Sequence, residues 1–321
     1  MCYNLSGDIM NYFTEEKRFN TLNNYYRNKF GTKVYKIALN GDFTCPNRDG
    51  TISYRGCIFC SESGSGDFAG KKENSLHQQF NTIKAIMKQK WENGKYIAYF
   101  QANTNTYGNI TKLNDLFETA LHLDPKIVGL SIATRPDCLP DNVIEYLSDL
   151  NQRTFLTIEL GLQTIHEKSL EWINRGHDLS VFVDAVKRLR EKEINVVVHI
   201  INGLPNETMD DMLETAKFLN KLDIQGIKIH MLFVQKKTRL EHYYKSQPFS
   251  LLTMEKYVEI VVQQLEHLND NIIIHRLTGD APRSELVAPK WTLKKFVVTN
   301  EIDKRMKTLD TYQGRLCTQD E

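Results

Sequence analysis

Residues 41–70 read GDFTCPNRDGTISYRGCIFCSESGSGDFAG and contain three of the six cysteines in this chain of 321 residues. Cys45, Cys57 and Cys60 follow the spacing C-x11-C-x2-C. The Pro, Asn, Asp and Gly residues between them favour turns, so the loop can fold back and bring the three thiols together. Closed zinc and iron–sulfur sites usually take four protein ligands. A cluster held by these three cysteines would therefore keep one metal position open for a small-molecule ligand.

Three other interpretations of these cysteines stay open at the level of the loop. The cysteines fit a Cys3His zinc knuckle, a thioredoxin-like Cys57-x-x-Cys60 pair, or buried free thiols, and a C-x-x-C pair alone is weak evidence. The third cysteine and the strand and helix pattern described below favour an iron–sulfur cluster. Cys2, Cys138 and Cys317 are isolated in the sequence and are interpreted as ordinary residues.

Composition and charge narrow the class of protein. The chain has 41 basic and 40 acidic residues, so its net charge of +1 indicates no global attraction to nucleic acid. No apolar run is long enough to cross a bilayer, which predicts a cytoplasmic protein without a membrane partner. The cytoplasm keeps thiols reduced, and clustered cysteines there favour metal binding over disulfides.

Short apolar segments rich in β-branched residues alternate with helical patterns along the chain. Strands are predicted at residues 33–39, 96–101, 127–132, 155–160, 196–201 and 226–232, each followed by a helical pattern. Six β/α units predict an α/β fold with a parallel sheet and helices outside it. We expect a partial (β/α)6 TIM-like barrel with a C-terminal extension. In such a barrel, ligands bind where the strands end.

Three parts of the chain are expected. Residues 1–30 form an N-terminal helical extension, with a helix cap at 14–17, and residues 31–235 form the barrel core with the cysteine loop 41–70. Residues 236–321 form the C-terminal extension that closes the barrel, with a seventh strand at 272–275 and a final helix over 291–308. This last part is locally basic and carries Trp291 and Phe296. It predicts either an RNA-binding surface or a solvated helix that packs its aromatic residues on the barrel.

The order of these motifs resembles the radical S-adenosylmethionine (SAM) superfamily. The C-x11-C-x2-C spacing, with FTCPNRDG around the first cysteine and RLTGDAP at 276–282, resembles the YhcC/YtqA family, a relative of the Elongator catalytic subunit. The resemblance spans about residues 30–313. It implies a [4Fe–4S] cluster on Cys45, Cys57 and Cys60, SAM as cofactor, a 5′-deoxyadenosyl radical, and an electron donor such as flavodoxin or ferredoxin.

The resemblance also implies which residues bind SAM. Gln101 to Thr104 take the place of a Gly-rich turn that relatives use for the SAM amino group, although the glycines are missing here. Gln163 and Arg175 match residues that oxygen-independent coproporphyrinogen oxidase places on the SAM ribose and carboxylate. Each residue also has a structural interpretation. Gln163 could cap the helix after the fourth strand, and Arg175 could pair with Asp178 at the surface.

Ionisable residues on apolar strands require partners. Glu159 lies on the fourth strand, where an unpaired carboxylate is costly to bury, so we expect it to meet either the SAM ribose or a basic side chain. His199 and His230 also lie on strands. We interpret both as core histidines with satisfied hydrogen bonds rather than as catalytic groups.

The resemblance implies tRNA as the substrate. The enzyme would act in the anticodon loop, converting the carboxymethylaminomethyl group of the wobble uridine to aminomethyl, on which a separate methyltransferase acts downstream. Arg276, Asp280 and Arg283 are expected at the barrel mouth, where they would receive the carboxylate and the amine of that group. The alternatives are a radical SAM enzyme for a small metabolite and a non-catalytic, zinc-stabilised RNA-binding module. No catalytic residue beyond the cluster is assigned.

Overall fold

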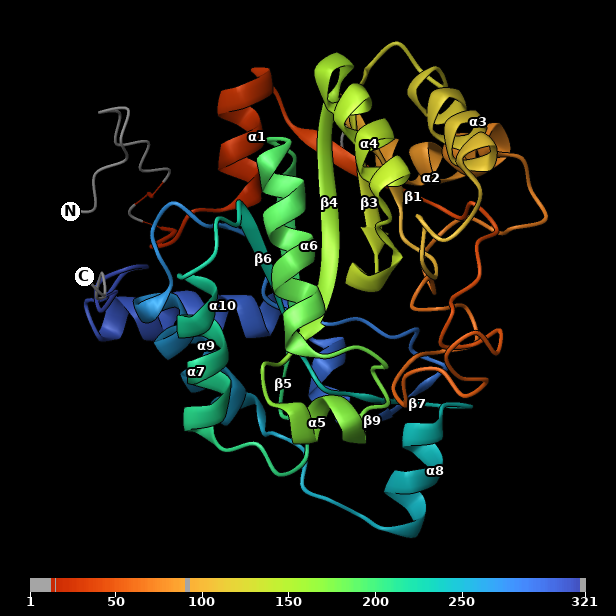
Figure 1. Cartoon of the computed structure of the whole chain (residues 1–321). Coiled ribbons are helices and arrows are strands. Elements are labelled where there is room, and N and C mark those ends of the chain that lie inside the picture. The colour runs from red at the N-terminus through yellow and green to blue at the C-terminus, as the bar shows by residue number, and fades with distance from the viewer. Residues whose placement is uncertain (1–12, 15, 90–92, 318–321) are drawn as a thin grey trace.

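The computed structural model describes residues 13–14, 16–89 and 93–317. Within these residues, seven parallel strands form one curled sheet in the order β1-β2-β3-β4-β5-β6-β8 (Figure 1). The strands are β1 (Val34–Leu39), β2 (Lys95–Phe100), β3 (Ile127–Thr134), β4 (Phe155–Gln163), β5 (Asn195–Asn202), β6 (Gly226–Met231) and β8 (Ile273–Arg276). The prediction of an α/β fold with a partial barrel is confirmed.

Helices follow the strands, and α4 and α6 lie across the outer face of the sheet (Figure 1). The helices are α1 (Leu22–Phe30), α2 (Leu76–Lys88), α3 (Ile110–Leu121), α4 (Asp141–Arg153), α5 (Glu167–Trp172), α6 (Leu179–Glu191), α7 (Met209–Leu219), α8 (Arg239–Ser246), α9 (Met254–His267) and α10 (Lys295–Thr308). Side chains at several N-termini fix where these helices begin. Ser75 and Thr208 form capping boxes at the starts of α2 and α7.

Strand β4 explains why the inside of this barrel is polar. Side chains alternate between the two faces of a strand. Leu156, Ile158 and Leu160 are fully buried in the apolar core that also contains residues of the surrounding helices. Glu159 and Gln163, on the other face, line the cavity inside the barrel. The sequence therefore places its apolar layer between sheet and helices and leaves the interior for polar chemistry.

Segments from both ends of the described chain adjoin β8. The backbone N–H of Ile274 donates to the carbonyl of Asn20 at 2.7 Å, and Gln313 donates to the carbonyl of Arg18 at 2.9 Å. The first bond pairs a backbone group of the edge strand β8, and the second joins the two flanking segments to each other.

The structure corrects the predicted start of the first helix and adds one helix and a small sheet. Helix α1 begins at Leu22 rather than near residues 14–17, because the side chain of Thr21 caps it by accepting from Asn24 N–H at 3.2 Å. Helix α8 and the antiparallel pair β7 (Val234–Gln235) and β9 (Leu286–Ala288) were not predicted. No helix in the described ranges combines the length and apolar character needed to span a bilayer.

Candidate active site

A cavity of about 280 Å³ lies inside the barrel and extends to the cysteine loop. Most residues that the sequence analysis singled out line it. They are Cys45, Cys57, Cys60, Gln101, Thr104, Glu159, Gln163, Arg175, Arg276 and Asp280. Arg283 is exposed and lies outside this lining, so the structure brings together two of the three residues expected to meet substrate.

Polar N–H groups surround the sulfur atoms of the cysteine loop. Cys57 Sγ accepts from Asn47 Nδ2 at 3.6 Å and from Arg175 Nη1 at 3.8 Å, and Arg48 Nη1 lies 3.9 Å from Cys60 Sγ. Burial, with the neighbouring Cys57 adding to it, raises the pKa of the Cys60 thiol to about 11. The thiolate therefore requires a cationic partner such as a bound metal, which deprotonates a coordinating thiol. Three thiols with N–H donors aimed at sulfur fit an iron–sulfur cluster.

A tight glycine and two hydrogen bonds to the segment after β2 hold the cysteine loop in place. Gly64 has a φ of 63°, and a Cβ atom there would lie 2.0 Å from Asn103 Oδ1, so the position requires glycine. The loop is also tied to the exit of β2, because Gln101 Nε2 donates to the carbonyl of Ser65 at 3.0 Å. The backbone N–H of Thr104 donates to the carbonyl of Thr44 at 3.2 Å. The residues expected at the SAM amino group thus also position the cysteines.

Gln163 and Arg175 share a space that Gly161 leaves open. A Cβ atom at Gly161 would lie 2.6 Å from Gln163 Nε2 and 2.8 Å from Arg175 Nη2. Gln163 has a φ of 76°, which is unusual for a residue with a side chain, and it lies at a register shift between β4 and β5. Bulges and strained backbone of this kind concentrate at functional sites.

Arg175 is buried without a carboxylate partner among the described residues. Arg175 is only 6% exposed, and its Nη2 donates to the carbonyl of Gly161 at 2.6 Å. The alternative surface pair with Asp178 is wrong, because Asp178 instead caps α6 by accepting from Val181 N–H at 3.0 Å. A buried guanidinium is normally paired with an anion. The environment of Arg175 therefore suits an anionic ligand.

Glu159 is the centre of a polar group on the middle of the strands, here called the interior cluster. Its two oxygens accept hydrogen bonds from Lys36 (2.6 Å), Ser131 (2.7 Å), Tyr99 (2.9 Å), His199 (2.7 Å) and Lys228. The sequence predicted either the SAM ribose or a basic side chain as the partner of Glu159. In the structure, the carboxylate pairs with the basic side chains of Lys36 and Lys228. Burial pushes the pKa of Glu159 up, but the charges of Lys228 and Lys36 outweigh it and hold that pKa well below its usual value.

The histidines of the interior are neutral at pH 7. Burial, reinforced by the charge of Lys228, lowers the pKa of His199 to about 4. Burial also lowers the pKa of His230, whose Nδ1 lies 3.1 Å from the carbonyl of Thr278. Both histidines have hydrogen-bond partners, as predicted. Burial lowers the pKa of Lys228 itself to about 8, although Glu159 opposes the shift.

The residues after β8 form a second polar wall of the cavity. Arg276 pairs with Asp280, and Lys295 Nζ lies 3.2 Å from the same carboxylate. Trp291 packs on the barrel, because its Nε1 donates to the carbonyl of Leu252 at 2.9 Å. Phe296, by contrast, is 77% exposed. The C-terminal aromatics therefore divide between the two interpretations that the sequence left open.

Sequence reasoning missed Lys36 and Lys228, although the signal was present. Each is a lone charge in an apolar strand, VYKIAL and GIKIHM, and the argument that gave Glu159 a partner applies equally to them. It also missed Asn47 and Arg48, whose side chains approach the sulfur atoms. Nothing in the loop sequence distinguishes these donors from ordinary turn residues.

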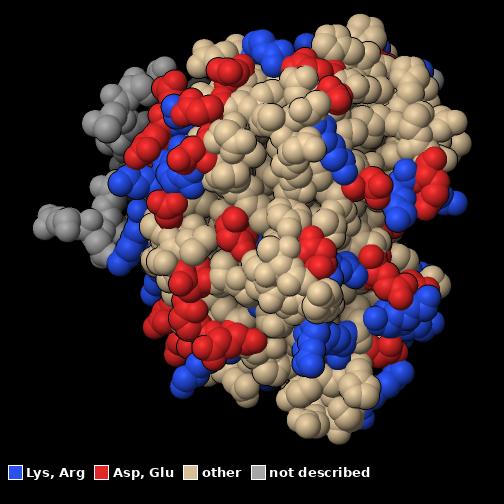
Figure 2. All heavy atoms as spheres, turned by 45° about the vertical axis from the view of Figure 1, so that its right-hand side comes forward, with Lys and Arg blue, Asp and Glu red and all other residues tan. Residues whose placement is uncertain are grey.

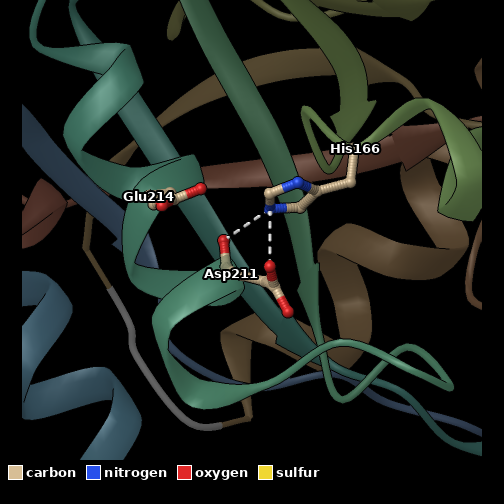
Figure 3. A group of neighbouring side chains, drawn as sticks. All are labelled: His166, Asp211 and Glu214. Carbon is tan, nitrogen blue, oxygen red and sulfur yellow. Dashed lines mark hydrogen bonds and ion pairs between the residues drawn. The ribbon is translucent and has the colours of Figure 1, made fainter.

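A separate cluster outside the cavity contains His166, Asp211 and Glu214, with ligand atoms within 4.8 Å of one another. Figure 3 shows His166 pointing toward the first turns of α7. Its Nε2 lies 2.9 Å from the backbone carbonyl of Asp211 and 3.9 Å from the Asp211 carboxylate. This nitrogen is already engaged by protein, and we interpret the cluster as a link between α5 and α7.

Acidic and basic side chains are interspersed across the face drawn in Figure 2. This agrees with the net charge of +1.

The fold and the cysteine-lined cavity are those of radical SAM enzymes. The sequence pattern of the Radical SAM superfamily matches residues 50–219, and that of the Radical SAM C-terminal domain matches residues 224–308. The chain belongs to the radical SAM superfamily, whose members use a [4Fe–4S] cluster and SAM.

Within the superfamily, the chain belongs with YtqA and YhcC. It is 50% identical to YtqA of Bacillus subtilis over 304 residues, covering 95% of this chain and 94% of YtqA. It is 33% identical to YhcC of Escherichia coli, covering 86% of this chain and 88% of YhcC. The tRNA uridine(34) acetyltransferase of Methanocaldococcus jannaschii is 27% identical over 177 residues, or 53% of this chain and 31% of that protein.

The archaeal Elp3 of Methanocaldococcus infernus has a similar fold. Its structure superposes with a TM-score of 0.65 at 17% identity, covering 87% of this chain and 64% of that one. The expected relationship to the Elongator catalytic subunit is confirmed.

Proposed function

We propose that this protein is a tRNA-modifying radical SAM enzyme that converts the carboxymethylaminomethyl group on C5 of the wobble uridine to aminomethyl. The observation that carries the proposal is one cavity lined by three cysteines, by a basic interior and by Arg175, which has no carboxylate partner within the described part of the chain. A related protein is named for its action on uridine 34 of tRNA, which supports the same nucleotide as the substrate. An electron donor such as flavodoxin or ferredoxin and a downstream methyltransferase complete the proposed partners.

The residues have distinct proposed roles. Cys45, Cys57 and Cys60 hold the cluster, Gln163 orients the SAM ribose, and Arg175 binds the SAM carboxylate. When bound, the cluster and SAM supply a 5′-deoxyadenosyl radical that abstracts a hydrogen atom. The protein binds and orients the reactants and excludes water from them.

The chemistry balances with SAM as the oxidant. The methylene carbon next to the substrate carboxylate would lose one hydrogen atom to the 5′-deoxyadenosyl radical. The substrate radical would then return one electron to the cluster, replacing the electron given to SAM, and release the N–H proton to solvent, which turns the C–N bond into an imine. Water hydrolyses the imine, and the carboxymethyl unit leaves as glyoxylate. The aminomethyl group that remains is a primary amine, which a methyltransferase can use. A wobble uridine splayed out of the anticodon loop is accessible to such a cavity, as RNA recognition usually requires.

The test is nucleoside mass spectrometry of tRNA from cells with and without the gene. Deletion should make the carboxymethylaminomethyl nucleoside accumulate and the methylaminomethyl nucleoside disappear. Expression of the wild-type gene should restore both levels, and the Cys45→Ala variant should not. Unchanged levels of both nucleosides in the deletion strain would contradict the proposal and favour a small metabolite as the substrate.

A further inference from the structure

The interior cluster contains more positive than negative charge. Lys36 and Lys228 both pair with the single carboxylate of Glu159. His199 contributes no charge at pH 7, because burial and the charge of Lys228 lower its pKa to about 4. Arg276, on the neighbouring strand β8, already pairs with Asp280. One lysine charge in the cluster therefore lacks a counter-ion among the described residues.

The two lysines differ in what they offer to a ligand. Both side chains are largely buried, with 10% of Lys228 and 15% of Lys36 exposed, but Lys228 lines the cavity and Lys36 is not part of the lining. Burying an unpaired charge is costly, and buried ions are normally paired. Since the cavity reaches Lys228, a ligand anion can supply the missing negative charge there.

We propose that Lys228 binds the carboxylate of the substrate's carboxymethylaminomethyl group, which thereby becomes the counter-ion that the interior cluster lacks. This inference rests on the proposed function. The carboxylate is the tip of the group, the part farthest from the base, so a nucleotide entering at the mouth presents it inward. Lys228 lies in the middle of β6, whereas Arg175 follows α5 and its guanidinium lies beside Gly161, near the end of β4, and beside Cys57. The two cations therefore serve two different carboxylates, those of substrate and SAM.

Recognition of the tip would make Lys228 a specificity-determining residue. Unmodified uridine and methylaminomethyluridine lack the carboxylate, so each would leave the lysine charge buried without a partner. A buried polar site rejects ligands that leave its groups unpaired. The interior cluster would thus select the substrate that still carries its carboxymethyl unit.

The experiment combines two RNAs with two variants. An anticodon stem-loop with the carboxymethylaminomethyl nucleoside is compared with the same RNA carrying methylaminomethyluridine, each binding to the anaerobically reconstituted enzyme with SAM omitted. We expect the wild type to prefer the carboxylate RNA by roughly tenfold or more. Lys228→Met should lose this preference, and Lys228→Arg should keep it. Methionine leaves Glu159 paired with Lys36, so the variant should fold, which circular dichroism checks.

Lys36→Met is the matched control, because it removes the other ion pair of Glu159 from outside the cavity lining. Lys36→Met also removes one positive charge from the cluster, so it should weaken the preference, but less than Lys228→Met does, because Lys228 still lines the cavity and contacts the ligand. An equal loss in both variants would overturn the assignment to Lys228. The dissociation constant of SAM should be unchanged in Lys228→Met, and a large rise would mean that Lys228 binds the SAM carboxylate instead. If the wild type converts the carboxylate RNA and Lys228→Met does so with the same KM, only this inference fails. A wild type that binds neither RNA overturns the proposed function as well.

Discussion

The cysteine loop and the interior cluster line the same cavity but have opposite electrostatic arrangements. In the loop, guanidinium and amide groups approach the sulfur atoms, and Arg175 has no acidic side chain of the described chain paired with it. In the interior, the carboxylate of Glu159 on β4 pairs with Lys36 of β1 and Lys228 of β6. The loop depends on charges that arrive with the cofactors, whereas the interior supplies most of its own charges.

This difference predicts that substitutions in the cysteine loop affect cofactor binding, whereas substitutions in the interior cluster affect the stability of the fold. Changes in the loop should affect what the protein holds while the barrel core, which lies between sheet and helices, stays intact. Changes in the interior should affect folding directly, because they unbalance charges buried within the sheet. The four predictions below test this division.

The largest expected effect is the loss of iron in Cys45→Ala. Removing one of three thiols should abolish loading, whereas the fold should persist because its apolar core lies elsewhere. Iron and sulfide analysis and thermal unfolding measure the two properties. Cys138→Ala is the control, since Cys138 is buried outside the cavity lining and its loss should leave iron loading unchanged. Full iron occupancy in Cys45→Ala would rule out its assignment as a ligand.

Glu159→Gln should destabilise the fold by roughly 3–5 kcal/mol, because it leaves two buried lysine charges without their partner. Denaturant unfolding of the two proteins measures the difference. The control is Glu118→Gln, which breaks the partly exposed pair with Arg153 and should cost about 1 kcal/mol or less. Equal stability changes in the two variants would show that the interior cluster has no special role in folding.

Arg175→Ala should weaken SAM binding by roughly ten- to a hundredfold, as expected for a lost charged hydrogen bond of about 1.5–3 kcal/mol. The iron content should stay close to that of the wild type. Equilibrium binding of SAM measures the effect. Arg188→Ala, which removes surface pairs with Asp141 and Asp184, should leave binding unchanged. A wild-type dissociation constant in Arg175→Ala would exclude this residue from the SAM site.

The smallest effect is a pH dependence of stability. Burial lowers the pKa of Lys228 from 10.5 to about 8, so between these values the unfolded chain binds more protons. The free energy of unfolding should therefore rise with pH inside this window, by about 1 kcal/mol per pH unit relative to Lys228→Met. Glu159 and His199 do not titrate in this window, because the pKa of Glu159 is held well below its usual value and that of His199 is about 4. Burial raises the pKa of Tyr99 above its ordinary value of 10.0, and the resulting contribution is common to both proteins and cancels in the comparison. Parallel pH profiles for the two proteins would contradict the prediction.

The strands and the gathering of cysteines could be predicted from the sequence because both signals are local. A short apolar run such as IVGLSI indicates β3 by itself, and turn formers between Cys45 and Cys57 indicate a folded-back loop. A local signal also misled. Residues 14–17 have the composition of a helix cap, yet the chain uses Thr21, because Phe19 is buried in the core and the carbonyl of Asn20 accepts from β8, which holds this segment outside the helix.

The interior cluster could be predicted only in part. The sequence shows that Glu159 requires a partner, but Lys36 and Lys228 lie 123 and 69 positions away, and only the curl of the sheet brings them together. The unpaired state of Arg175 is likewise a tertiary property, since Asp178 is near in sequence but is used as a helix cap. Strand β7 has two residues, too few for any periodicity to appear.

The contact between Asn20 and Ile274 also sets an order of events during synthesis. The carbonyl of Asn20 leaves the ribosome early, but its donor lies 254 positions further along the chain. At roughly 5–20 residues per second, the donor follows on the order of 10–50 s later. Throughout that interval the strands β1 to β6 can pair in sequence, while the segment before α1 has nothing to bind. The segment before α1 is therefore among the last parts of the chain to be fixed, and a chain released before β8 leaves both edges of its sheet open to other molecules.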